Sequence, residues 1–166
     1  MKKAAIIMGS DSDLKVMSAA AGVLEDYGIP YEVHIYSAHR TPEETAAFAA
    51  AAKDNGFGVI IAGAGMSAAL AGVLAAHTVL PVIGVPLKSS VFDGMDALLS
   101  TVMMPPGIPV ASVAVNGAKN AAHLAAQILA VGDEALAEKI ASVKKAQKEA
   151  VLQKDASVME KMKEYR

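Results

Sequence analysis

Cysteine and tryptophan are absent from this chain of 166 residues, and aromatic residues make up only 4% of it. Without cysteine there can be no disulfide, no thiolate metal ligand and no catalytic thiol. Hydrophobic residues still reach 54% of the sequence, so we expect a core of aliphatic side chains and alanine. The chain is long enough for one domain with a sizeable core.

A strong net charge and long apolar runs are also lacking. The formal net charge of -2 argues against nucleic acid as the main partner. The apolar run after Lys3 is too short for a signal peptide or a membrane span, and glycine and proline break the longer runs. We therefore expect a soluble, cytoplasmic protein that contacts no membrane.

Short apolar runs alternate with helix-like segments over the first 130 residues. The expected strands are 4–8, 31–36, 58–62, 81–85 and 110–115, and the expected helices are 14–27, 42–55, 66–77, 94–103 and 118–131. Continuous apolar strands are typical of a parallel sheet that is covered on both faces. The alternation predicts an α/β domain over residues 1–132.

Residues 133–166 differ, with 7 acidic and 8 basic residues and a narrow apolar stripe that includes Leu136, Ile140 and Val143. This pattern predicts a C-terminal helical tail. One narrow stripe buries little area on its own, so we expect the tail to pack on a neighbouring subunit. A solvated helix with fraying ends is the alternative.

Polar or glycine-rich turns follow three of the expected strands, at 9–13, 37–40 and 63–67. Ligands of open α/β sheets bind beyond the carboxyl ends of the strands, near a switch in strand order. The three turns therefore predict one ligand site.

The central turn of the three combines a histidine with a scarce arginine. Arg40 is one of only two arginines in the chain. We expect Thr41 as the N-cap, Pro42 as the first helical residue and Glu44 as the capping-box partner. His39 and Arg40 would then lie at a helix start, where exposed N–H groups and the helix dipole favour anions.

The first turn offers two hydroxyls and two carboxylates. Ser10 and Ser12 could bind a phosphate together with backbone N–H groups, whereas Asp13 suits ribose hydroxyls because a carboxylate repels phosphate. Ordinary helix capping is the alternative for each of these residues.

The third turn satisfies the G-x-G-x-x-A dinucleotide pattern at Gly63–Ala68. The dinucleotide-binding fold requires an acidic residue at the end of the next strand, and this sequence has none there. A tight turn with close helix packing and a pocket for a small anion or carbon dioxide are the alternatives. Gly65, Met66 and Ser67 are the candidate ligand-binding residues here.

Histidine is the remaining source of reactive groups. None of the four histidines pairs with another at metal-ligand spacing, so we expect no metal. Only His39 lies at a predicted ligand-facing turn, and imidazole exchanges protons near neutral pH.

Taken together, several ordered motifs resemble the N5-carboxyaminoimidazole ribonucleotide mutases of de novo purine synthesis. The motifs are Met8–Asp13, Ser37–Pro42, Ala62–Gly65, Leu80–Pro86, Gly94–Ser100 and Met104–Val110. The resemblance implies a flavodoxin-like three-layer α/β/α domain with a five-stranded parallel sheet and an extended C-terminal helix. It also implies a homo-octamer without metal or organic cofactor, and a ribonucleotide substrate with carbon dioxide as an intermediate.

The resemblance also assigns roles to residues. It implies that His39 is both acid and base, that Asp13 binds ribose, and that residues 103–109 line the base. The implied phosphate-side residues are Ser10, Ser12, Ser37 and Arg40. Ala38, Gly65, Met66 and Ser67 complete the expected substrate-binding set.

One segment departs from the mutase pattern, in which G-A-G-G-A-A-H-L-P-G is usual. Residues 63–72 read G-A-G-M-S-A-A-L-A-G, so Met66 replaces a glycine, Ala69 a histidine and Ala71 a proline. This segment is closer to the G-R-S-N-A-L type of the related carboxylases, which use carbon dioxide directly, although Arg40 stands where those carboxylases usually have lysine. A direct carboxylase therefore stays as an alternative function. The G-x-G-x-x-A match leaves a non-catalytic, nucleotide-binding flavodoxin-like module as a second alternative.

Overall fold

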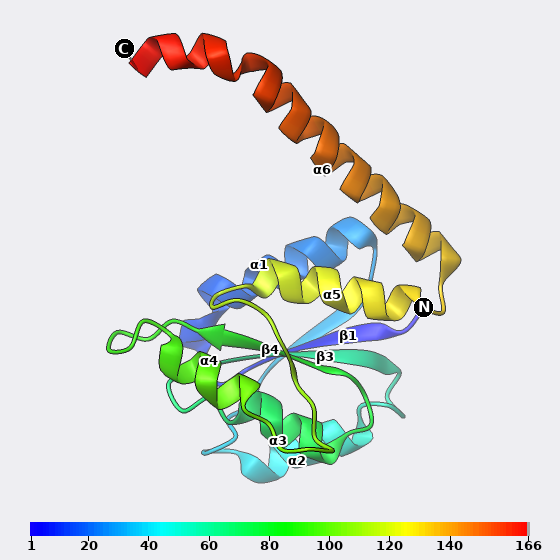
Figure 1. The fold of residues 1–166 in the computed structure, drawn as a ribbon. Helices are drawn as coiled ribbons and strands as arrows, with labels where there is room; N and C mark the ends of the chain where they lie inside the picture. Colours follow the sequence, from blue (N-terminus) through cyan, green and yellow to red (C-terminus); the bar gives the residue numbers. More distant parts are fainter. Residues whose placement is uncertain (166) are drawn as a thin grey trace.

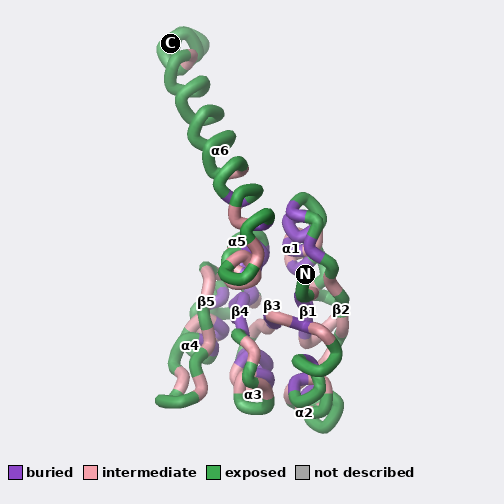
Figure 2. Tube along the Cα trace, turned by 90° about the vertical axis from the view of Figure 1, so that its right-hand side faces the viewer, coloured by how far each residue is buried: buried purple, intermediate pink, exposed green. Residues whose placement is uncertain are grey.

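The computed structural model describes residues 1–165 (Figure 1) and contains one parallel sheet with the strand order β2-β1-β3-β4-β5 (Figure 2). The strands are β1 (Lys3–Met8), β2 (Tyr31–Ile35), β3 (Phe57–Gly65), β4 (Val82–Leu87) and β5 (Ala111–Ser112). The helices are α1 (Leu14–Tyr27), α2 (Pro42–Ala51), α3 (Leu70–His77), α4 (Met95–Val102), α5 (Ala118–Ala130) and α6 (Glu134–Lys161), with short 3-10 helices at Asp11–Asp13 and Met162–Tyr165. The predicted five-stranded parallel sheet is confirmed.

Helices cover both faces of the sheet, which gives three layers. α1 and α5 lie on one face, and α2, α3 and α4 lie on the other (Figures 1 and 2). Successive strand residues point to opposite faces. Ile6 and Ile61 accordingly belong to the cluster beneath α1 and α5, whereas Ile7 and Ile60 belong to the cluster beneath α2 and α3.

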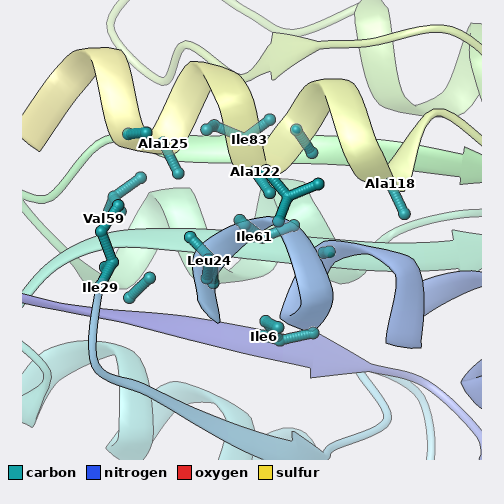
Figure 3. Packing of buried hydrophobic residues seen from close by; sticks show 14 of the residues in the cluster. Ile6, Leu24, Ile29, Val59, Ile61, Ile83, Ala118, Ala122 and Ala125 are labelled. Atoms are coloured by element: carbon teal, nitrogen blue, oxygen red, sulfur yellow. The ribbon is translucent and has the colours of Figure 1, made fainter. Parts of the chain in front are cut away.

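Alanines of α5 form the contact with the sheet. Ala118, Ala122 and Ala125 are fully buried and lie over Ile61 and Ile83 (Figure 3). Side chains this small bring the helix axis close to the strands, so the interior fills without large aromatic groups. This packing agrees with the core expected from the composition.

β3 runs further than the sequence predicted, so residues 63–65, the first part of the turn expected at 63–67, belong to the strand. Gly65 still pairs with Leu87 of β4, and α3 begins only at Leu70. A Cβ on Gly63 would lie 2.4 Å from the sulfur of Met17. Gly63 therefore allows α1 to pack closely on the strand and does not form a turn.

β5 is much shorter than the predicted strand 110–115. It contains two residues, and beyond it the chain keeps isolated bonds to β4, from Val113 N–H to the Gly84 carbonyl (3.1 Å) and from Asn116 N–H to the Pro86 carbonyl (2.8 Å). A tight turn from Ala114 to Gly117 replaces the regular ladder. An edge strand tolerates this irregularity because only one side must pair.

α6 begins at the N-cap Asp133, whose side chain accepts a hydrogen bond from Leu136 N–H (3.1 Å). Leu136 and Ile140 are buried in the core of their own domain. The rest of α6 extends away from the domain and is largely exposed (Figure 2). The start of the apolar stripe thus packs on its own domain, and not on a neighbouring chain as expected for the whole tail. No helix within residues 1–165 is long and apolar enough to cross a membrane.

Candidate active site

A cavity of about 600 Å³ lies at the carboxyl ends of β1 to β4. The strand order reverses at β1, with β2 on one side and β3 on the other, so the cavity occupies the switch point. All ten predicted site residues line it, namely His39, Ser10, Ser12, Asp13, Ser37, Ala38, Arg40, Gly65, Met66 and Ser67. Three turns that are distant in sequence therefore meet in one place.

Two serine hydroxyls form a cluster after β1. Ser10 Oγ accepts a hydrogen bond from the N–H of Ser12 (3.3 Å) and another from the Ser12 hydroxyl (3.0 Å). Ser10 thus caps the short helix that precedes α1. Capping leaves both serines in the candidate site, since both also line the cavity.

The Asp13 carboxyl lies at the same turn, within 3.4 Å of the Ser12 hydroxyl. Burial raises the pKa of Asp13, and this effect outweighs the hydrogen bonds from Ser10 and Ser12, which lower it. A partly desolvated carboxylate is a strong hydrogen-bond acceptor for sugar hydroxyls.

We predict that Asp13→Asn stabilises the fold while weakening ligand binding. A carboxyl whose pKa is raised by folding costs stability when ionised, and that cost fades as the pH falls below the ordinary pKa of 3.8, because the carboxyl then becomes protonated in both states. Urea unfolding should show the variant more stable at pH 7 and the two proteins converging in acid. KM should rise about tenfold or more, because hydrogen bonds to charged groups contribute roughly 1.5–3 kcal/mol. An unchanged KM would contradict the ribose-binding role.

The turn after β2 is held by Thr41, although not in the predicted way. Thr41 is the N-cap residue of α2 but forms no side-chain cap bond, so the expected capping box with Glu44 is absent. Its hydroxyl accepts from Ser37 N–H (2.8 Å) and donates to the Ser37 carbonyl (3.1 Å). This pair of bonds closes the loop that carries His39 and Arg40.

Arg40 connects the first two turns. Its Nη2 donates to the Gly9 carbonyl (3.0 Å), and its backbone N–H donates to Ser37 Oγ (3.2 Å). The guanidinium thus lies beside the serine cluster, where it adds positive charge to a group of hydroxyl donors. His39 is exposed on the same turn and lines the cavity. Hydroxyls, guanidinium and imidazole together suit a phosphorylated ligand whose far end undergoes proton transfer.

Met66 forms the third side of the cavity in a conformation that favours glycine. Its φ is +56°, and 69% of its surface is exposed. The left-handed region costs a non-glycine residue about 1 kcal/mol or more. The first two glycines of the dinucleotide pattern lie within β3, so the pattern does not form a phosphate-binding turn here.

Sequence reasoning missed the fourth edge of the cavity, which Lys88, Ser89 and Ser90 line just beyond β4. The sequence feature that could have identified these three residues is their position directly after a buried strand next to β3. Residues 103–109 were expected to line the base, but several of them, including Met104, border a separate cavity of about 620 Å³. No group of three or more His, Asp or Glu side chains within residues 1–165 is arranged to hold a metal ion.

Comparison with known proteins gives one consistent result. A protein-family profile described as AIR carboxylase matches residues 3–150. The N5-carboxyaminoimidazole ribonucleotide mutase of Pyrococcus abyssi is 58% identical over 84% of this chain and 80% of its own length. The enzyme of the same name from Thermotoga maritima is 53% identical over 93% and 90%.

Two further comparisons concern the carboxylases and the fold. The phosphoribosylaminoimidazole carboxylase of Saccharomyces cerevisiae is 54% identical over 90% of this chain, which matches 26% of that longer protein. A crystal structure of PurE from Treponema denticola superimposes with a TM-score of 0.83 at 31% identity and covers 93% of this chain and 96% of the other.

Proposed function

We propose, since the chain belongs to the AIR carboxylase family, that it is an N5-carboxyaminoimidazole ribonucleotide mutase of purine biosynthesis. The reaction moves a carboxylate from the exocyclic N5 to C4 of the aminoimidazole ring. The observation that carries this proposal is the convergence of His39, Arg40 and the serine cluster on one cavity. We also propose a cytoplasmic location, because the reaction is a step of nucleotide synthesis.

In this mechanism the ribonucleotide binds by its phosphate and ribose. Ser10, Ser12, Ser37 and Arg40 bind the phosphate, and Asp13 accepts hydrogen bonds from ribose hydroxyls. Support comes from the bond between Arg40 and the Gly9 carbonyl, which holds the cation beside the hydroxyls. The aminoimidazole ring then extends toward His39 and the end of β3.

His39 acts in turn as acid and base. It protonates N5 as the N–C bond of the carbamate breaks, which releases carbon dioxide within the cavity. C4 attacks the carbon dioxide, and His39 removes the C4 proton as the ring regains aromaticity. One proton is given and one is taken, so the histidine ends in its initial state. The enclosed carbon dioxide reacts at high effective concentration.

A direct carboxylase is the second candidate, and Ala69 is the observation that favours it. This residue lines the cavity at the position where the mutase pattern has histidine. The product would be the same, but aminoimidazole ribonucleotide and free carbon dioxide would replace the N5-carboxylated substrate.

We also propose that the subunits assemble as a homo-octamer. The exposed apolar side chains on the distal part of α6 support this proposal, among them Val151, Leu152 and Met159. An isolated helix with such a surface gains stability by packing against another subunit.

The expected result is that purified protein converts N5-carboxyaminoimidazole ribonucleotide to the 4-carboxy product without added bicarbonate. Each substrate should be offered separately and product formation followed, and light scattering on the same preparation should give the octamer mass. If product forms only from aminoimidazole ribonucleotide with bicarbonate, the mutase proposal is refuted and the direct carboxylase is supported. Absence of product from both would refute the enzyme proposal, and a monomer mass would refute the assembly.

A further inference from the structure

A second basic side chain, that of Lys88, lines the cavity at the end opposite Arg40. Arg40 follows β2 and Lys88 follows β4, and the strand order places β1 and β3 between them. Three strand spacings correspond to roughly 14 Å. Among the cavity-lining residues in the described chain, the only carboxylate is that of Asp13. The cavity therefore has a positive group at each end.

The backbone of Lys88 is held in place. Its N–H donates to the side-chain oxygen of Asn116 (3.0 Å), and the neighbouring Ser89 hydroxyl donates to the Asp96 carboxylate (3.2 Å). Gly94 packs against it closely enough that a Cβ would lie 3.2 Å from the Lys88 Cα. The start of the side chain is thus fixed at the cavity rim while its end stays able to move.

The ammonium group of Lys88 has a partner that a ligand can displace. Nζ lies 2.5 Å from the Asp93 carboxylate, and the two side chains are 58% and 78% exposed. Exposed ion pairs contribute little to stability, about 0–1 kcal/mol. Breaking the ion pair between Lys88 and Asp93 so that Lys88 can bind a ligand carboxylate therefore costs little free energy.

We propose that Lys88 binds the carboxylate on the aminoimidazole ring and makes the cavity selective for carboxylated ribonucleotides. This inference rests on the proposed function, whose substrate has a phosphate at one end and a carboxylate at the other. With the phosphate beside Arg40, the carboxylate lies toward the end of β4. The ammonium also faces the oxygens of carbon dioxide, on which negative charge develops as C4 attacks.

The test compares two ligands by calorimetry, 4-carboxyaminoimidazole ribonucleotide and aminoimidazole ribonucleotide, which differ only in the carboxylate. Lys88→Met is expected to weaken binding of the first by about tenfold or more, as for the loss of a charge-assisted hydrogen bond. Binding of the second should stay within about twofold. Lys88→Arg should recover most of the loss.

Two matched variants separate a direct contact from a structural effect. Asp93→Asn removes the carboxylate that pairs with Lys88 but leaves the positive charge of Lys88 in place. Asparagine tolerates the left-handed φ of +57° at position 93. Asp93→Asn should bind the carboxylated ligand at least as tightly as the wild type. Arg40→Met should weaken both ligands alike, because both carry the phosphate.

Equal weakening of both ligands by Lys88→Met, or no weakening, would overturn the inference. Binding does not depend on turnover, so the two proposals can fail separately. If Lys88→Met weakens binding of the carboxylated ligand alone, but the wild-type protein turns over neither substrate, only the proposed enzyme activity is refuted. Wild-type protein that binds neither ligand would refute both.

Discussion

His39→Asn is expected to lower kcat by about 10²- to 10⁴-fold, the usual contribution of a general acid–base residue. Asparagine keeps the approximate size and polarity of the side chain but cannot exchange a proton near neutral pH. Both proton transfers depend on this residue in the proposed mechanism, so forward and reverse rates should fall together. Product formation under substrate saturation measures the effect.

The control for this experiment is a second exposed histidine. His77 lies at the end of α3 and does not line the cavity, so His77→Asn should retain wild-type kcat. Calorimetric binding of aminoimidazole ribonucleotide should survive in both variants, because Arg40 and the serines are unchanged. A folded His39→Asn protein with full activity would exclude histidine as the acid and base.

The location of the site could be predicted because it depends on strand ends. Short apolar runs identified the strands, and polar or glycine-rich residues directly after them identified the edge of the sheet where the cavity lies. Nothing beyond chain order was needed to bring Ser10, His39 and Met66 to one cavity, since parallel strands all end at the same edge.

Details that depend on tertiary contacts could not be predicted. Glycine suits both a turn and a close approach, and only the position of Met17 shows that Gly63 serves the second purpose. The Thr41 hydroxyl could bond to its helix or to the preceding loop, and the loop is its partner in the fold. Lys88 was missed because a surface lysine is common, and only the shape of the cavity distinguishes this one.

Gly84 of β4 is expected to be the glycine most sensitive to an added methyl group. A Cβ at this position would lie 2.3 Å from Thr101 Cγ2 and 3.0 Å from Val110 Cγ1. Thr101 is buried and β-branched, so its methyl cannot rotate away cheaply. Gly84→Ala should lower the free energy of unfolding by about 1–3 kcal/mol, the range for overpacked cores.

The same substitution at an open position provides the control. Gly22 lies within α1, and a Cβ there would meet nothing within 4 Å. Gly22→Ala should therefore stabilise the protein by roughly 0.5–1 kcal/mol through helix propensity. Urea unfolding compares the variants at one protein concentration, so that the proposed assembly affects the stability of each variant equally.

Thr101→Ser tests whether the clash with Gly84→Ala lies at the Thr101 methyl. Serine removes Cγ2 but keeps the hydroxyl, which donates to the Ala97 carbonyl (2.7 Å). The single change should cost about 1 kcal/mol for the lost methyl. In the double variant the new Cβ occupies the space that Cγ2 leaves, so the two costs should not add, with a coupling of about 0.5–3 kcal/mol. Additive costs would instead place the strain at Val110, on the segment that leads into β5.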